Sequence, residues 1–220
     1  MHKISIFFIL ISFFGYSQRS SYSPYSYFGV GETNFSATVE NQMMGGNTAY
    51  YDSVHQNMNN AASMSKLKFV NYSIGVDLKS TSYLSESNNE KSTAAAINYL
   101  SVAIPTNILS FSFGIKPKTS VGYLLENDDQ TLIPSELNRF TGSGGISNAF
   151  VSIGFELFKN WGIGVSSSYA FGNLNHYHTK ILENIELYTR VSSESSVSGL
   201  DYNFSTVYQK TFNNKITLYT

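Results

Sequence analysis

The sequence predicts an all-β protein, a transmembrane antiparallel up-and-down β-barrel, on three observations. Alternating apolar and polar residues recur from Leu67 onward, and this period of two is typical of strands with one face in lipid and the other in a polar lumen. Tyr and Phe number 16 each, while charged residues are only 13%, which suits a lipid-facing sheet with aromatic girdles. Short connections at 105–107, 158–161 and 211–215 alternate with long polar stretches near 80–92, 127–144 and 173–195, as periplasmic turns and outer loops alternate in outer-membrane barrels.

Charge and cysteine content exclude several classes of protein. The formal net charge is -1, whereas a nucleic-acid surface needs clustered Lys and Arg, so we expect no nucleic-acid partner. The chain has no Cys, which excludes a disulfide framework, a thiolate metal site, a Cys nucleophile and a lipid-modified N-terminal Cys.

Residues 1–17 predict a signal peptide. A basic start at Lys3 precedes an apolar run, Ile4–Phe14, and small residues follow at Gly15 and Ser17, as a signal peptidase requires. The alternative, a membrane anchor helix, needs about 20 apolar residues, and this run is too short. We therefore expect export to the cell outer membrane of a Gram-negative bacterium.

The mature chain divides into an N-terminal segment, residues 18–66, and a strand region, residues 67–220. The N-terminal segment is rich in Ser, Gly, Asn and Met and has no strand period, so we expect it to be ordered but mostly irregular. Six complete strands and the start of a seventh are predicted after it. They are 70–79, about 93–105, 109–126, 145–158, 161–174, about 199–209, and a beginning at Lys215. Because an open sheet this small would expose two edges to lipid, we expect a truncated chain that carries part of a larger barrel.

The stretch 109–126, LSFSFGIKPKTSVGYLLE, could be one bent strand or a hairpin turning at Pro117. Pro-Lys does not supply the positive φ angles of favoured two-residue hairpin turns. The odd-numbered apolar series also continues past the proline through Val121, Tyr123 and Leu125. We predict one strand, bent at Gly114–Pro117, with the neighbouring strand locally unpaired because Pro cannot donate to the ladder.

The predicted inner faces carry small and polar residues. In the fifth strand the residues between the large ones run from Gly162 to Gly172 and are Gly, Ser or Ala. They could leave space for a folded segment or a ligand, or they could only let the barrel curve. Asp77 and Lys79 lie on the predicted lumen face of the first strand, where we expect them to line water or pair with the N-terminal segment; a substrate role is the second reading.

Several stretches resemble the FadL-type outer-membrane transport proteins for hydrophobic compounds, in the version common in Bacteroidota. SPYSYFGVGE (23–32) resembles the opening of that branch, and residues 42–67 look like its N-terminal plug. The plug has an Asn-Pro-Ala element just before the first strand. Here the element reads Asn59-Asn60-Ala61 or Asn60-Ala61-Ala62, without the Pro. Residues 113–126 and 141–174 look like the body of the barrel.

The resemblance implies a fourteen-stranded barrel, of which this chain would be roughly the first half, with the N-terminal segment as a hatch in the lumen. It also implies a kink in the third strand that opens a side door to the membrane. The implied function is passive transport of hydrophobic, fatty-acid-like small molecules, porin-like in architecture, with that ligand and outer-membrane lipid as partners. Ligand-binding or gating roles would fall on Asn60 and Ala61 in the plug and on Gly114 and Pro117 at the kink. An apolar molecule gains about 0.8 kcal/mol per CH₂ by leaving water, so such a route needs no energy source.

A second reading keeps the architecture and changes the function. The chain would be a non-transporting barrel that works as a subunit of a secretion or outer-membrane assembly complex, as PorV-type proteins do, and its partners would be other outer-membrane or secretion-machinery proteins. A transporter needs a continuous apolar pocket, whereas a scaffold can be plugged and can use its loops.

Catalytic and metal-binding patterns are weak, so we expect no enzyme, no cofactor and no metal. TGSGGI (141–146) is not followed by the Lys of a phosphate loop, and no G-x-S-x-G motif supplies a Ser nucleophile. His176 and His178 fall on one side of an extended chain, which can suit a metal. No carboxylate is fixed near them, and we read them as residues of an outer loop.

Overall fold

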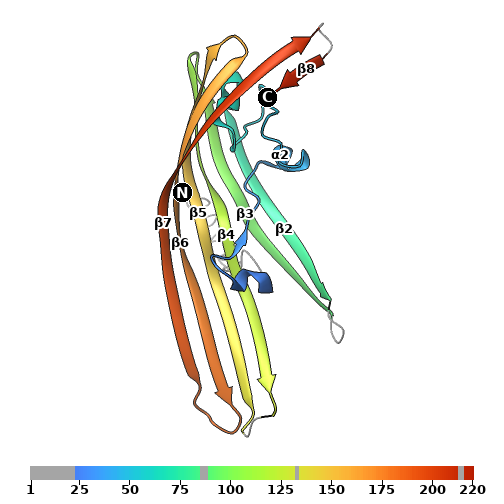
Figure 1. Cartoon of the computed structure of the whole chain (residues 1–220), viewed down its shortest axis with the longest axis vertical. Coiled ribbons are helices and arrows are strands. Elements are labelled where there is room, and N and C mark those ends of the chain that lie inside the picture. The colour runs from blue at the N-terminus through green and yellow to red at the C-terminus, as the bar shows by residue number, and fades with distance from the viewer. Residues whose placement is uncertain (1–22, 85–88, 132–133, 213–215) are drawn as a thin grey trace, which may run out of the picture.

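The computed structural model describes residues 23–84, 89–131, 134–212 and 216–220. The predicted signal peptide, residues 1–17, lies outside the described residues. Within them, eight strands form one sheet with the order β2-β3-β4-β5-β6-β7-β8, and β1 pairs with β4 beside this path. All pairs are antiparallel. The sheet is long and curved, and the N-terminal segment lies within its curve (Figure 1).

The elements follow one another in chain order, with η denoting a 3-10 helix. They are η1 (Pro24–Tyr27), β1 (Glu32–Thr33), α2 (Val39–Met43), η2 (Ala61–Lys66), β2 (Asn71–Leu84), β3 (Asn89–Pro105), β4 (Leu109–Asp129), β5 (Glu136–Phe158), β6 (Trp161–Leu182), β7 (Thr189–Phe212) and β8 (Ile216–Tyr219). The predicted all-β class with antiparallel up-and-down order is confirmed. The described strands form an open sheet, so closure into a barrel stays a prediction. In the described part of the chain, no helix has the length and apolar character that a membrane crossing requires.

The strands extend well beyond their predicted ends. β5 begins at Glu136 rather than at 145, and β6 continues to Leu182 rather than to 174. The polar stretches near 80–92, 127–144 and 173–195 were expected to be long loops, but most of their described residues lie in strands. Alternation marks only the part of a strand whose two faces differ in polarity. Beyond that part both faces carry polar residues, so the alternation fades while the hydrogen-bonded ladder continues.

The strand register aligns apolar side chains into rows across the convex face. One row is Tyr72, Val102, Phe113, Val151, Ser167 and Tyr202, and the next is Ile74, Leu100, Ile115, Ala149, Tyr169 and Leu200. Most of these large apolar side chains are exposed. The row between them, on the opposite face, contains Ser73, Ser101, Gly114, Phe150, Ser168 and Asp201. The sheet therefore has an apolar outer face and a mostly small or polar inner face.

The stretch 109–126 lies in a single strand, β4, as predicted, but its faces change along the way. The pairing of β4 with β5 shifts between Pro117 and Thr119, and such a bulge inserts one extra residue into the strand. Side chains beyond it exchange faces, because successive residues of a strand point to opposite sides. Val121 and Tyr123 are therefore buried on the inner side, and the expectation that they continue the outer series of Phe111 and Phe113 is wrong.

Glycines on the inner face of β5 and β6 form the seat of the N-terminal segment. A Cβ added at Gly154 or Gly164 would overlap the backbone of Ala61 or Ala62, and one at Gly162 would lie 3.0 Å from the Ala62 carbonyl oxygen. η2 therefore lies directly against the sheet backbone. Of the two readings of this small-residue face, the structure supports space for a folded segment.

Polar and apolar contacts hold η2 on this seat. The Ala62 N–H donates to Ser205 Oγ at 2.9 Å, and Ala62 packs in a buried cluster with Tyr51 and Val207. Lys66 Nζ pairs with Glu156 Oε1 at 2.5 Å. Three strands, β5, β6 and β7, thus contribute to binding one short helix.

Gly164→Ala should loosen the N-terminal segment, because the new methyl group would displace the backbone of Ala62. We expect a cost of about 1–3 kcal/mol, the usual range for overpacking, and faster tryptic cleavage after Lys66 and Lys68. Gly199→Ala is the matched control, since a Cβ at Gly199 meets no atom within 4 Å. Equal cleavage rates in the two variants would contradict the proposed seat.

Candidate functional site

The main irregularity of the sheet is a fork between β3 and β4. The two strands pair only from Pro105 with Ser110 to Leu100 with Ile115, although β3 continues back to Asn89 and β4 continues on to Asp129. Beyond the last pair, the β2–β3 hairpin separates from β4 (Figure 1). The two diverging strands are called the β3 lip and the β4 lip below.

Gly114 and Pro117, both predicted site residues, lie where the fork begins. Gly114 pairs with Ser101 one step before the strands part, and a Cβ there would lie 2.8 Å from Ser101 Cβ and 2.9 Å from Phe150 Cε1. Glycine thus lets β3 and the buried Phe150 ring approach closely. Pro117 lies at the bulge of β4 and has no N–H to offer the β3 lip. The local unpairing of the neighbouring strand, expected from this proline, is present.

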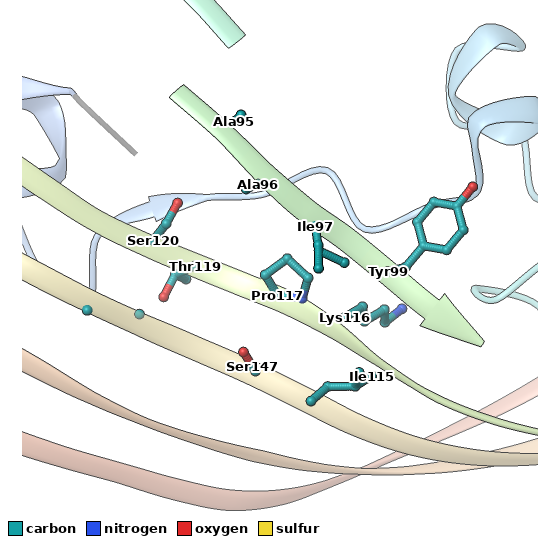
Figure 2. A pocket seen from close by; sticks show the side chains of 12 residues that line it. Ala95, Ala96, Ile97, Tyr99, Ile115, Lys116, Pro117, Thr119, Ser120 and Ser147 are labelled. Carbon is teal, nitrogen blue, oxygen red and sulfur yellow. The ribbon is translucent and has the colours of Figure 1, made fainter. Parts of the chain in front are cut away.

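A cavity of about 490 Å³ lies in the fork. Small and apolar side chains of both lips line it, with Ala95, Ala96 and Ile97 on β3 and Ile115, Pro117 and Thr119 on β4 (Figure 2). Gly144, Gly145 and Ser147 of β5, together with Tyr99, Lys116 and Ser120, complete the lining. Short side chains, two glycines, one tyrosine and one lysine thus border the cavity.

The N-terminal segment covers the β4 lip by strand addition. In β1, Glu32 pairs with Ser120 and Thr33 with Thr119. Flanking backbone bonds run from Asn34 N to Lys118 O at 2.9 Å and from Ser23 N to Gly122 O at 2.7 Å. Gly31 has φ +95°, and a Cβ there would lie 2.6 Å from Ser120 O, so the approach requires glycine.

The same segment also contacts the β2–β3 hairpin, through side chains. Glu32 Oε1 accepts from Lys79 Nζ at 2.5 Å, which agrees with the expectation that Lys79 pairs with the N-terminal segment. The Val39 N–H donates to Tyr99 Oη at 3.1 Å, and Ser101 Oγ donates to Gln56 Oε1 at 3.0 Å. One segment therefore joins both lips of the fork from the inner side.

Asn60 and Ala61, the other predicted site residues, lie at the start of η2. Asn60 Oδ1 accepts from the Ala62 N–H at 3.2 Å, and its Nδ2 donates to Thr48 O at 2.8 Å. Ala61 is buried against Gly154 and Gly164 of the sheet. The adjacent Asn59 accepts from Lys116 Nζ at 2.8 Å, which brings this element next to the fork. These contacts are structural; ligand binding or gating by the four residues stays a prediction.

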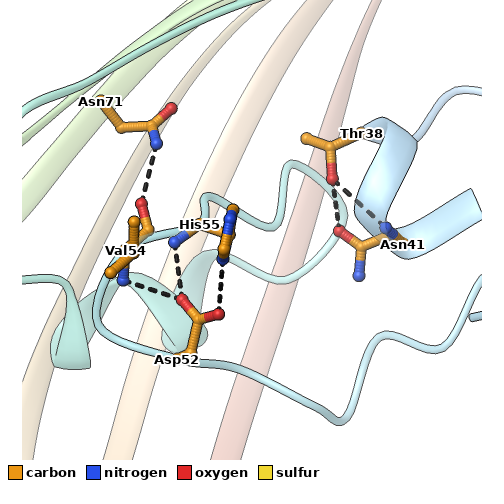
Figure 3. A network of polar contacts seen from close by, with 6 residues as sticks. All are labelled: Thr38, Asn41, Asp52, Val54, His55 and Asn71. Atoms are coloured by element: carbon orange, nitrogen blue, oxygen red, sulfur yellow. Dashed lines mark hydrogen bonds and ion pairs between the residues drawn. The ribbon is translucent and has the colours of Figure 1, made fainter.

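A polar network fixes the loop between α2 and η2 (Figure 3). The Asp52 carboxylate accepts from the N–H groups of Val54 and His55 at 2.8 and 2.6 Å, and its second oxygen lies 2.6 Å from His55 Nδ1. Asn71 Nδ2 donates to Val54 O at 2.8 Å and ties this loop to β2. The hydrogen bond with Asp52 raises the pKa of His55. Burial raises the pKa of Asp52, but the hydrogen bonds from His55 and Val54 outweigh it and hold that pKa below its ordinary value.

His176 and His178 lie in β6 and not in an outer loop, which corrects the expectation. Tyr123 Oη lies 2.7 Å from His176 Nδ1, and the tyrosine ring crosses β5 over Gly142, where a Cβ would overlap it. The His178 ring stacks on Phe140 with centroids 4.4 Å apart, and its Nε2 lies 2.7 Å from Asn138 Oδ1. Within the described residues, no group of three or more potential metal ligands is close enough to hold an ion.

The aromatic cluster around these histidines escaped prediction, because Tyr123 was placed on the opposite face. Tyr27 of η1 completes it by packing edge-on against Tyr123, at 5.2 Å between centroids. Gly142 was the available signal, since a strand glycine often marks a ring that crosses it.

Comparison with known proteins settles the family. The BamG family model matches residues 1–220, the whole chain. The chain belongs to the BamG family. No curated protein and no solved structure matches it significantly.

BamG is a family of components of the outer-membrane assembly (BAM) complex, so membership implies a role in outer-membrane assembly and an association with the outer membrane. The FadL-type assignment is therefore wrong, and with it the basis for fourteen strands, a transport route and a fatty-acid-like ligand. The stretches that carried the resemblance contain two features: strands whose apolar and polar residues alternate, and glycines on which an inner segment packs. A protein with another function can meet the same requirements.

The 52–57 loop should be most stable in mildly acidic solution. The contribution of His55, whose pKa is raised, is complete below its unfolded value of about 6.5 and is lost as the pH rises through the folded pKa. The contribution of Asp52, whose pKa is lowered, is complete above about 3.9 and is lost as the pH falls through the folded pKa. Amide exchange of residues 52–57, corrected for the intrinsic rate, should be slowest between about pH 4 and 6.5. In His55→Asn the loss above that window should vanish, and a retained loss would contradict the assignment.

Proposed function

We propose that this chain is a non-catalytic, membrane-embedded subunit of the outer-membrane assembly complex. The observation that carries the proposal is the match of the whole chain to the BamG family. It favours the reading in which a barrel serves as a complex subunit.

The geometry supports a membrane-embedded position. Rows of exposed apolar side chains cross β2 to β7 on the convex face, and the residues between them on the inner face are mostly small or polar. Water would penalise so broad an apolar face, whereas hydrocarbon would not. We propose that β2 to β8 form part of a barrel wall whose convex face meets lipid.

The N-terminal segment fits the role of an inner support. It is packed on the glycine row of β5 and β6 and joins both lips of the fork. We propose that it plugs the lumen and braces the wall, so that the ends of the strands and the turns that join them are left for partner proteins. This arrangement needs no bound cofactor and no chemical step.

Affinity purification tests the proposed function. A tagged chain, extracted from outer membranes in mild detergent, should retain the other subunits of the assembly complex in fixed stoichiometry. Its depletion should lower the amounts of unrelated barrel proteins in the outer membrane. A tagged outer-membrane protein of unrelated function is the control. A chain that purifies without assembly subunits, and whose loss leaves other barrels unchanged, would contradict the proposal.

Two neighbouring substitutions test which face meets lipid. Phe204 on β7 is 78% exposed on the convex face, and Asn203 lies on the inner face, opposite Ser166. Phe204→Arg should destabilise the inserted protein by about 2–4 kcal/mol, the cost of arginine near the bilayer midplane, whereas Asn203→Arg should cost far less. Urea titration of the protein folded into vesicles measures both. A greater cost at Asn203 would reverse the proposed orientation.

A further inference from the structure

The β3 lip of the fork has a pairing strand on only one side. From Lys91 to Ile97 the register with β2 is regular and continuous. Along these residues, no other strand in the described part of the chain pairs with the edge that turns toward β4. The next two residues bond to the N-terminal segment through side chains alone, Asn98 Nδ2 to Phe35 O at 3.4 Å and Tyr99 Oη to Val39 N at 3.1 Å.

The β4 lip shows how this protein satisfies the backbone groups of such an edge. On β4, the backbone beyond the fork is paired with β1 and with the residues beside it. The protein thus covers one lip by adding an extended segment to its edge. The β3 lip offers the same row of backbone donors and acceptors.

Part of the β3 lip lies beside exposed apolar side chains of the convex face. On the convex face Val76 and Leu78 of β2 lie opposite Ile97 and Ala95, and Ile97 is 65% exposed. Backbone groups without partners are costly in hydrocarbon, and acyl chains can neither donate nor accept hydrogen bonds. A partner that satisfies the hydrogen-bonding groups of this edge must therefore supply backbone N–H and C=O groups of its own.

The sequence of the β3 lip also lacks the usual protection of a free edge. Natural edge strands carry charges or prolines that block the addition of another strand. Residues 92–97 read STAAAI, with neither. The alanines leave the cavity of about 490 Å³ beside the edge, and their short side chains let another backbone approach (Figure 2).

We propose that the β3 lip, at residues 92–97, accepts an extended segment of another outer-membrane protein, which adds to the sheet as a strand inside the fork. The inference rests on the proposed function, because an assembly complex brings outer-membrane polypeptides to this chain. Main-chain hydrogen bonds supply the affinity in this mode of recognition, and the side-chain pockets beside the edge supply the selectivity.

Site-specific photo-crosslinking in intact outer membranes tests the inference. The photoreactive residue p-benzoylphenylalanine replaces Ala95 or Ile97 in the tagged full-length chain. It replaces Val151 in the control, since Val151 is 55% exposed on the same face and lies on β5, which pairs on both sides. Heat-modifiable migration in gels confirms that each variant is folded. We expect protein adducts at Ala95 and Ile97. At Val151 we expect none, because the proposed orientation places only lipid beside this side chain.

The position of the adducts identifies strand addition. Ala95 and Ile97 are two residues apart on one face of a strand, so they should react with residues two apart in one segment of one partner. Lipid adducts alone, adducts with residues 1–22 of the same chain, adducts scattered over unrelated proteins, or no adducts would each overturn the inference. Retention of assembly subunits on the tagged chain is scored in the same samples. If they are retained without a strand adduct, only the acceptor role fails; if they are lost, the proposed function fails.

Discussion

A strand inside a sheet must satisfy the backbone groups on both of its edges, and this constraint explains most of the features described here. Between β4 and β7 the sheet meets it by continuous antiparallel pairing. Between β3 and β4 it does not, because the strands part after Leu100 and Ile115. The irregular features of the sheet gather at this point: a glycine that permits close approach, a proline without an N–H, a bulge, and an inner segment that acts as a replacement strand.

The inner segment makes different kinds of contact at its two ends. Near residues 31–34 it pairs by backbone, which depends little on side-chain identity. Near η2 it relies on the absence of side chains, since Gly154 and Gly164 leave no room for a Cβ. Apart from the glycine required at Gly31, the first contact can tolerate many sequences, whereas the second cannot, so the glycines of β5 and β6 are the more specific part of the attachment.

Sequence alternation located the strands where the two faces of the sheet differ in polarity, and it failed where that contrast ends. Phe111, Phe113, Val151 and Ile153 were placed on the correct face because large apolar residues alternate with small or polar ones there. His176 and His178 were placed in a loop because the alternation weakens near them, although β6 continues to Leu182. Val121 and Tyr123 were placed on the wrong face because one extra residue at the bulge reverses every later position, and composition does not reveal it. Of the four predicted site residues, Gly114 and Pro117 lie at the fork and Asn60 and Ala61 at the start of η2. The alternation could not distinguish a transporter from an assembly subunit, because both functions are compatible with the same kind of β-sheet.

The attachments of the N-terminal segment have a consequence for biogenesis. Ala62 binds Ser205, 143 positions later in the chain, and Tyr51 contacts Gln209, 158 positions later. Such distant partners cannot be engaged until most of the polypeptide has emerged and its strands have aligned, since closing loops of this length precedes any gain from the contact. The N-terminal segment is therefore among the last parts to dock, and until then the glycines of β5 and β6 on which it packs remain uncovered.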